Sequence, residues 1–446
     1  MELMEISKII IGLEVHIELK TKSKMFCSCS ADHFGKEPNT QTCPVCLGLP
    51  GALPYPNKKA IEDTVLIGLS LGGENSKKSW FDRKNYFYPD LPKGYQISQY
   101  KNPLCVGGFL ELDDGKRIGI TRAHLEEDTA KLQHGTVEGE EVSLIDFNRS
   151  GVPLVEIVSE PDLSSSDEVK EYLEKLQQLV RYLGVSDADM EKGSMRCEPN
   201  VNIEIKDGDN LYRTPITELK NINSFRFAKR AIDYEVQRQF EEFKEKRETV
   251  TGGNKQTRGW DETKGVTVLQ RQKEEAKDYR YFPEPDIPPI YWTDSDLESF
   301  KGKIKEFELP SDKKKRFIRQ YLLSEYKAKI LTDLKEQADY FEVSVKAGKH
   351  KNVLPEELSN VIINKRAKEG LSPEELIDFI VSSRQKRNVS DEEIDNLIVK
   401  HLNGNPELAK SYKEGKPQAL GKIVGLIKEE TGIVVSLDRI IKNIGD

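Results

Sequence analysis

The sequence contains no hydrophobic run close to the ~20 residues that a membrane-spanning helix requires. Its opening residues, 1–5, are acidic on balance, which fits neither a secretory signal nor an organellar transit peptide. Only six cysteines occur among 446 residues, too few to indicate a disulfide framework in a chain of this length. We therefore expect no membrane partner and a cytoplasmic, reducing location.

Basic residues are not in excess either. Lysine and arginine total 68 against 76 acidic residues, for a net charge of −8, so a nucleic-acid partner would have to meet a local basic surface. The sequence also lacks a Walker A motif and a G-x-G-x-x-G fingerprint, and it does not resemble a P-loop kinase. Phosphoryl transfer without these motifs needs divalent cations, and acidic residues would hold them.

The stretch 11–19 alternates apolar and polar residues, a pattern typical of a half-buried strand. Its apolar face carries Leu13, Val15, Ile17 and Leu19, and its polar face carries Glu14, His16 and Glu18. Two carboxylates and an imidazole along one strand face suit Mg²⁺ or Mn²⁺. A solvated face of an edge strand is the alternative, and this stretch taken alone favours it.

Four of the six cysteines form two closely spaced pairs. Cys27 and Cys29 make a CxC pair, and Cys43 and Cys46 make a CxxC pair. This spacing predicts a tetrahedral four-cysteine Zn²⁺ site with a structural role, because a closed site leaves no open position for chemistry. His33 lies between the pairs and could replace one thiolate, although we expect it to be an exposed loop residue.

Three further segments carry candidate site residues. Glu126 and Glu127 belong to a run of three acids near His124, which is either solvated at a turn or gathered around metal ions. In the segment 151–160, a period of two places Glu156 and Glu160 on one mixed face, where a structural role is favoured. The segment 83–100 is rich in aromatic and basic residues. It is either an active-site wall or a packed surface loop, and it contains Lys84 and Lys93.

Arginine also occurs in a proline-fixed segment, 278–289, where Arg280 stands between tyrosines. A guanidinium held in this way suits bidentate contact with phosphate or carboxylate. Stacking on its aromatic neighbours is an equal alternative.

The length allows two or three domains, and the composition changes near residue 294 from mixed strands and helices to lysine-rich helices. We expect domains at 1–293, 294–385 and 386–446. Within the first, a helix over 165–184 is indicated by a capping box of Ser165 with Glu168 and a glycine stop. A long charged helix is predicted over 224–247.

Together these motifs resemble one family closely, the B subunits of the aspartyl/glutamyl-tRNA amidotransferases, in their bacterial form. The resemblance covers 8–293 almost without a break and returns at 323–326 and 413–428. It is carried by the segments 12–16, 27–46, 83–99, 122–128, 151–162, 191–200, 219–225, 257–262 and 278–289. It implies an α+β fold. A glutamine synthetase-like cradle domain built on an antiparallel sheet precedes an all-α helical domain and a small helical tail domain that binds tRNA.

The resemblance also implies a reaction. ATP phosphorylates the side-chain carboxylate of Glu-tRNA(Gln) or Asp-tRNA(Asn), and ammonia displaces the phosphate to give Gln-tRNA(Gln) or Asn-tRNA(Asn). The ammonia comes through a channel from the glutaminase, or A, subunit, and the small C subunit completes a heterotrimer. Two alternatives keep the fold without this activity: a non-catalytic tRNA-binding or assembly subunit, and a free-standing ligase for a small molecule.

Site residues follow from the resemblance position by position. It implies Mg²⁺ at Glu14, His16 and Glu127, with Glu126 adjoining, and it implies Lys84 and Lys93 near the ammonia path. To these we add Glu156 and Glu160 in the acidic basin, and Arg196 and Arg280 as phosphate contacts. The sequence departs from the family at 198–200, where Glu-Pro-Asn replaces the usual Asp-Ala-Asn.

Overall fold

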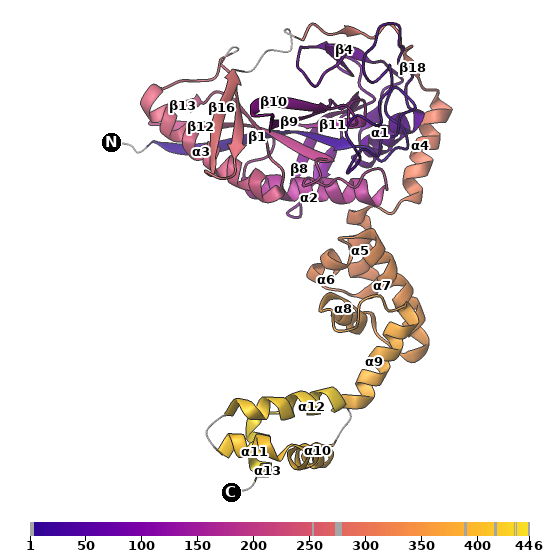
Figure 1. Ribbon diagram of the computed structural model, residues 1–446, viewed down its shortest axis with the longest axis vertical. Helices are drawn as coiled ribbons and strands as arrows, with labels where there is room; N and C mark the ends of the chain where they lie inside the picture. The colour runs from indigo at the N-terminus through magenta and orange to yellow at the C-terminus, as the bar shows by residue number, and fades with distance from the viewer. Residues whose placement is uncertain are drawn as a thin grey trace. The chain divides into compact units, whose positions relative to one another are not determined.

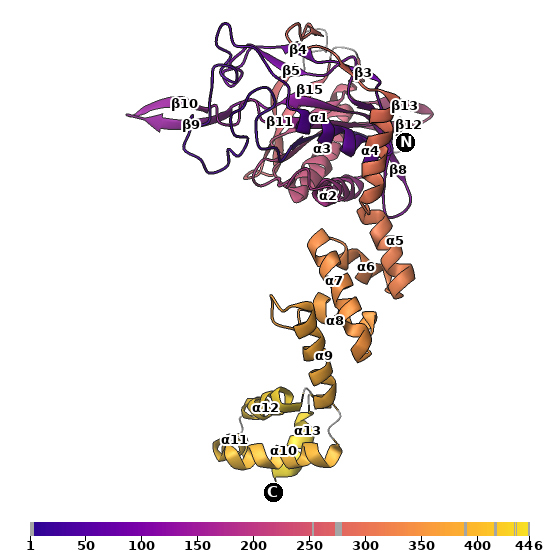
Figure 2. The same cartoon turned by 90° about the vertical axis from the view of Figure 1, so that its right-hand side faces the viewer.

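The structure is a computed structural model, and it describes residues 4–251, 254–272, 279–387, 390–413, 417–431, 433 and 435–444. The chain forms two compact units, Met1–Leu309 and Pro310–Asp446, drawn in two orientations in Figures 1 and 2. Among the described residues, no helix is long and apolar enough to cross a membrane.

Strand β1 (Glu5–Glu18) lies inside an eleven-stranded sheet in the first unit. The strand order is β16 (Val266–Gln272), β15 (Gln256–Asp261), β14 (Thr217–Lys220), β12 (Met195–Asp207), β1, β11 (Pro153–Ser159), β8 (Arg117–Glu127), β6 (Cys105–Val106) and β2 (Glu74–Asn75). Two more strands, β13 (Asn210–Arg213) and β7 (Phe109–Glu111), pair with β12 and β8.

The sheet is mixed, which corrects the prediction of an antiparallel one. Every neighbouring pair of described strands is antiparallel apart from β14 and β15. A parallel pair needs a long crossover, and here helix α3 (Phe225–Lys246) lies between the two strands in the chain. The long charged helix predicted over 224–247 is thus confirmed.

Helix α2 (Ser166–Tyr182) and α3 pack side by side on one face of the sheet, as Figures 1 and 2 show. The apolar side chains of β1, among them Leu13, Val15 and Ile17, are buried in the core with those of α2. The Ser165 hydroxyl accepts the Glu168 N–H at the start of α2, as predicted, while the Glu168 carboxylate accepts the N–H of Ser164 instead of completing a capping box with Ser165. Because β1 alternates, its polar side chains lie on the other face.

Smaller elements surround the sheet. Helix α1 (Lys58–Ser70) packs against β8. Two short strands, β4 (Asp82–Asn85) and β5 (Tyr95–Ser98), fall in or overlap the segment 83–100 and form a sheet with β17 (Phe282–Pro283). Two separate pairs are β3 (Lys78–Ser79) with β18 (Ile290–Tyr291), and β9 (Lys131–Val137) with β10 (Glu140–Asp146). Helix α4 (Asp294–Glu306) buries Phe300 in the same core. The first unit therefore extends one helix beyond the boundary expected after residue 293.

The second unit is helical throughout its described residues and has two hydrophobic cores. The first joins α5 (Pro310–Tyr321), α6 (Glu325–Leu331), α7 (Lys335–Gly348), α8 (Pro355–Ile363) and α9 (Pro373–Arg387). The second joins α10 (Asp391–Gly404), α12 (Gly421–Thr431) and α13 (Leu437–Ile444), with α11 (Pro406–Lys413) packed against it. Two short 3₁₀ turns are Lys349–Lys351 and Pro417–Leu420. Residues 414–416, within the family-like segment 413–428, lie outside the described residues.

Candidate active site and metal centre

Three strands bring a first acidic group together on the polar face of the sheet. His16 of β1 lies opposite Glu156 of β11, and Glu156 lies opposite His124 of β8. His16 Nε2 is 3.5 Å from Glu156 Oε2 and 3.7 Å from Glu126 Oε1. Ligands about 2.1 Å from one Mg²⁺ lie roughly 3–4.2 Å apart, so His16, Glu126 and Glu156 fit a single hard cation.

A second histidine and a serine orient these carboxylates. His124 Nε2 lies 3.2 Å from Glu156 Oε2, and the Ser98 hydroxyl donates to Glu126 Oε2 at 3.0 Å. Burial would raise the pKa of Glu156, but the charge and hydrogen bond of His124, and then those of His16, hold it well below its usual range. Glu156 is therefore an anion although it is buried.

His16 itself is charged at neutral pH when no metal is bound. Burial lowers its pKa, but the hydrogen bond with Glu156 and the charges of Glu156, Glu126 and Glu198 outweigh that effect and raise it to about 9. A metal ion binds only the neutral imidazole. A bound cation would thus replace the proton as the partner of the two carboxylates.

A second acidic group lies beside the first on the same face of the sheet. Glu14, Glu198 and Glu218 come from β1, β12 and β14, and their ligand oxygens lie within 4.8 Å of one another. The Lys220 ammonium is 2.6 Å from Glu198 and 3.9 Å from Glu218. Burial raises the pKa of Glu198, but the charges of Lys220 and His16 lower it to about 2.

Hydrogen bonds hold the second group in position. The Asn200 amide donates to Glu14 Oε1 at 3.0 Å, and the Thr257 hydroxyl donates to Glu218 Oε2 at 2.9 Å. An all-carboxylate set suits Mg²⁺ or Mn²⁺. In the described structure Lys220 supplies the positive charge that such a cation would bring.

Glu127 lies apart from both groups, so the expected Mg²⁺ set of Glu14, His16 and Glu127 does not come together. Its Oε1 is 2.6 Å from Lys93 Nζ and accepts the N–H of Ile97 at 2.9 Å. The reason is the period of two in β8, which turns Glu126 and Glu127 to opposite sides. Glu127 and Lys93 line a cavity of about 220 Å³ that also reaches Phe26, Cys46, Leu49 and Tyr95.

Lys84 lies within electrostatic reach of the first acidic group. Burial lowers the pKa of its ammonium, but Tyr281 and the charges of Glu126 and Glu156 raise it well above its usual range. Its Nζ is 5.1 Å from the centre of the Tyr279 ring. This cation therefore stands over an aromatic wall at the edge of the acidic basin.

Three other predicted residues lie outside the two groups. Arg196, opposite His16 in the register, bonds to Asp128, and its buried Nε has no hydrogen-bond partner among the described residues. Arg280 is exposed, with a left-handed backbone at φ 46°, and none of the contacts between described residues ties it to the acidic groups. Glu160 is exposed and accepts the Thr121 hydroxyl at 2.7 Å. Strand β11 ends at Ser159, so Glu160 lies beyond the alternation that was expected to align it with Glu156.

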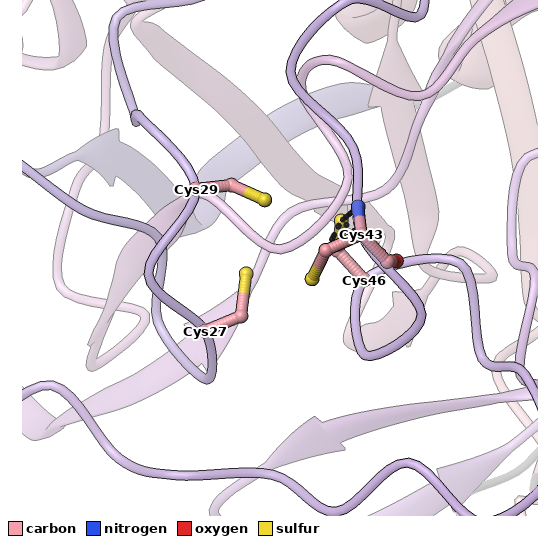
Figure 3. A group of neighbouring side chains, drawn as sticks. All are labelled: Cys27, Cys29, Cys43 and Cys46. Atoms are coloured by element: carbon pink, nitrogen blue, oxygen red, sulfur yellow. Dashed lines mark hydrogen bonds between the residues drawn. The ribbon is translucent and has the colours of Figure 1, made fainter.

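The four paired cysteines meet in one cluster. Figure 3 shows Cys27 and Cys29 facing Cys43 and Cys46, and the four sulfurs lie within 4.8 Å of one another. Tetrahedral Zn²⁺ with bonds of about 2.3 Å places its sulfurs about 3.8 Å apart, and the Cys43 and Cys46 sulfurs are separated by 3.9 Å. The Cys43 N–H donates to Cys46 Sγ at 3.2 Å. This geometry fits a structural Zn²⁺.

His33 does not join the cysteines. Its Nε2 contacts Glu18 Oε2 at 3.0 Å, so the loop between the cysteine pairs is fastened to the end of β1. The hydrogen bond from the Cys27 thiol lowers the pKa of Cys46 to about 4. Cys46 is therefore the thiol of the cluster that loses its proton most readily.

Sequence reasoning missed Glu198, Glu218 and Lys220 as members of the site. The signal for Glu198 was present, because it shares the face of its strand with Arg196 and Asn200. For Glu218 and Lys220 the strand order was needed, since β14 reaches the site only through its pairing with β12.

Comparison with known proteins agrees with the resemblance seen in the sequence. The family model described as the GatB/GatE catalytic domain matches residues 9–298. A protein of Roseiflexus castenholzii is 51% identical over 353 residues, which cover 78% of this chain and 71% of that protein. One from Thermomicrobium roseum is 53% identical over 342 residues, covering 75% and 68%. One from Thermotoga maritima is 50% identical over 368 residues, covering 81% and 73%.

All three relatives are named as the B subunit of aspartyl/glutamyl-tRNA(Asn/Gln) amidotransferase. The matched region contains both acidic groups, the cysteine cluster and the Lys93–Glu127 pair. The chain belongs to the family of aspartyl/glutamyl-tRNA(Asn/Gln) amidotransferase B subunits.

Proposed function

We propose that this chain is the catalytic B subunit of a tRNA-dependent amidotransferase. It phosphorylates the side-chain carboxylate of Glu-tRNA(Gln) or Asp-tRNA(Asn) with ATP and amidates the product with ammonia. The observation that carries the proposal is the pair of acidic groups on one sheet face, in a chain of this family. An assembly subunit without chemistry would have no use for this many buried and half-buried carboxylates, because removing each one from water costs free energy.

Each acidic group holds one Mg²⁺ in this proposal. His16, Glu126 and Glu156 bind the first, and Glu14, Glu198 and Glu218 bind the second. Bound Mg²⁺ neutralises the triphosphate and polarises the phosphoryl group. His124 and Ser98 keep the carboxylates of the first group oriented.

Positively charged side chains complete the basin. Lys84 offers an ammonium to the phosphoryl or acyl-phosphate oxygens, and Arg196 offers its Nε, to which no described residue is hydrogen-bonded. Arg280 and Glu160 have weaker claims, because each is exposed. Lys220 neutralises the second group until a cation takes its place.

Ammonia reaches this basin from the other side of β8. The cavity lined by Lys93 and Glu127 is the inner end of its path, and the ion pair between them closes that end. The source is the glutaminase, or A, subunit, held with this chain by the small C subunit in a cytoplasmic heterotrimer. The four cysteines hold a structural Zn²⁺ beside the same cavity.

The domains divide the work. Residues 1–293 together with α4 form a glutamine synthetase-like cradle. The rest of the helical domain, up to residue 385, and the tail domain 386–446 bind tRNA. Two separate hydrophobic cores in the helical unit support this division.

The test is E156Q in the heterotrimer reconstituted with the A and C subunits. ATP, Mg²⁺, ammonium chloride and Glu-tRNA(Gln) are supplied, and ADP release and Gln-tRNA(Gln) formation are followed. We expect both to fall about 100-fold or more, with tRNA binding and melting temperature retained. E141Q, on the exposed strand β10, is the matched control. Activity near that of the wild type in E156Q would instead favour a non-catalytic subunit.

A further inference from the structure

A buried lysine stands beside the cysteine cluster and takes no part in the proposed chemistry. Lys24 is fully buried, at 0% exposure. Its ammonium donates to the carbonyls of Gln41 at 2.8 Å and Phe147 at 3.2 Å, and to Cys46 Sγ at 3.6 Å. None of these three acceptors is a carboxylate.

A buried ammonium without a carboxylate partner is costly unless another negative charge is near. The cysteine cluster supplies that charge, since four thiolates around one Zn²⁺ leave an excess of negative charge. Donation to a metal-bound sulfur also withdraws electron density from it, which makes the thiolate less reactive. The positive charge of Lys24 and the excess negative charge of the cluster therefore compensate each other.

We propose that Lys24 is a positioning and charge-compensating residue of the four-cysteine Zn²⁺ site, acting through Cys46. The inference rests on the proposal that the cysteines hold Zn²⁺. In this role the Lys24 ammonium stabilises the metal site from outside the ligand shell, through its contact with Cys46 Sγ. Its hydrogen bonds to the two carbonyls do not require a positive charge.

A purely architectural role is the competing explanation. The two carbonyls belong to segments distant in sequence, so Lys24 could serve only to tie these segments together. The explanations differ in what a replacement has to keep. Charge compensation requires a cation at this position, whereas tying carbonyls requires only N–H donors.

The experiment uses the full chain and three variants. K24R keeps the charge, K24Q keeps N–H donors without the charge, and K313M removes another buried lysine, in the second unit, that pairs with Asp339 and Glu342. Zinc content is measured first in the wild type, because a protein without zinc would refute the metal proposal itself. Zinc affinity is then measured by competition with a chromogenic chelator. The thiolate-to-metal charge-transfer band is recorded after Co²⁺ substitution.

We expect K24Q to lose about 10–100-fold in zinc affinity, as is typical for outer-sphere partners, and to shift the Co²⁺ charge-transfer band to lower energy. K24R and K313M should keep the affinity and band of the wild type. If the wild type and K24Q bind zinc with equal affinity, Lys24 does not have the proposed role, although the zinc site itself is confirmed.

K24Q could fail to fold, and a measurement on the wild type then decides. The protein is loaded with an NMR-active cadmium isotope and its lysine ammonium nitrogens are labelled. A scalar coupling between the Lys24 ammonium and cadmium through Cys46 Sγ is the expected result. A Lys24 resonance without that coupling would refute the proposal.

Discussion

Glu126 and Glu127 are adjacent in β8, yet they serve opposite sides of the sheet. Glu126 Oε1 lies 3.7 Å from His16 Nε2, whereas Glu127 Oε1 lies 2.6 Å from Lys93 Nζ. One peptide bond therefore separates the acidic basin from the cavity behind it. In the proposed reaction, a single strand therefore separates the side where the phosphoryl group is transferred from the side where ammonia arrives.

Replacing each acid with its amide should separate the two halves of the reaction. E126Q should lower ADP release and amide formation together, by about 100-fold or more, since it removes a metal ligand. E127Q keeps an acceptor for the Ile97 N–H but loses the charge that pairs with Lys93, so amide formation should fall while ADP release continues. Both products are measured in the reconstituted heterotrimer. Equal loss of both products in E127Q would contradict this separation.

Removing the Lys220 ammonium should expose the charge of the second acidic group. In K220M, Glu198 and Glu218 lose the ammonium that pairs with them. In the presence of EDTA, we expect the free energy of unfolding to fall by about 1–3 kcal/mol, which is less than for breaking a fully buried ion pair. Mn²⁺ should then raise the melting temperature more in K220M than in the wild type. K229M, whose surface lysine pairs with Asp167, is the control. If Mn²⁺ raises the melting temperatures of the wild type, K220M and K229M equally, the second acidic group does not bind a cation.

The alternation of β1 was enough to predict both of its faces, because a period of two needs no knowledge of neighbours. The same rule, applied to residues 126–128, would have separated Glu126 from Glu127, but the acids were grouped by charge. Glu218 could not be found in this way, since its place depends on pairing with β12. Glu160 lies one residue beyond the end of β11, and strand ends are the least reliable part of a prediction from sequence.

The helical unit should show an acid-sensitive contact at Glu342. Burial raises the pKa of this carboxyl, but hydrogen bonds from Arg316 and Tyr321, and then the charges of Arg316 and Lys313, lower it from 4.5 to about 2. A lowered pKa stabilises the fold above the unfolded value, and the stabilisation is lost as pH falls through the folded value. The difference in free energy of unfolding between the wild type and E342Q should therefore reach its maximum of about 1–2 kcal/mol above pH 4.5. It should shrink towards pH 2.

Hydrogen exchange of peptides from α5 and α7 measures this difference locally. E336Q, an exposed acid in the first turn of α7, is the matched control and should show no comparable trend. A difference for E342Q that grows as pH falls would mean that the carboxyl is neutral in the folded protein.

Zinc removal should loosen the segment between the cysteine pairs without unfolding the sheet. C29S deletes one predicted ligand, and we expect zinc to be lost and residues 30–45 to become sensitive to protease. The β1 core should keep its protection, because Leu13, Val15 and Ile17 are buried against α2. C105S, at a buried thiol outside the cluster, serves as the control. Wild-type zinc content in C29S would refute the four-cysteine site.

Strand β1 is made first and paired late. Its neighbour β11 is synthesised only after the β9–β10 hairpin, and its other neighbour, β12, only after α2. Until then its apolar side chains have no sheet to join, and pairings this distant in sequence form slowly. The nascent chain therefore carries an unpaired, aggregation-prone strand until β11 and β12 have been synthesised. Chaperones that hold emerging chains on the ribosome should matter more for this protein than for one whose first strand closes a local hairpin.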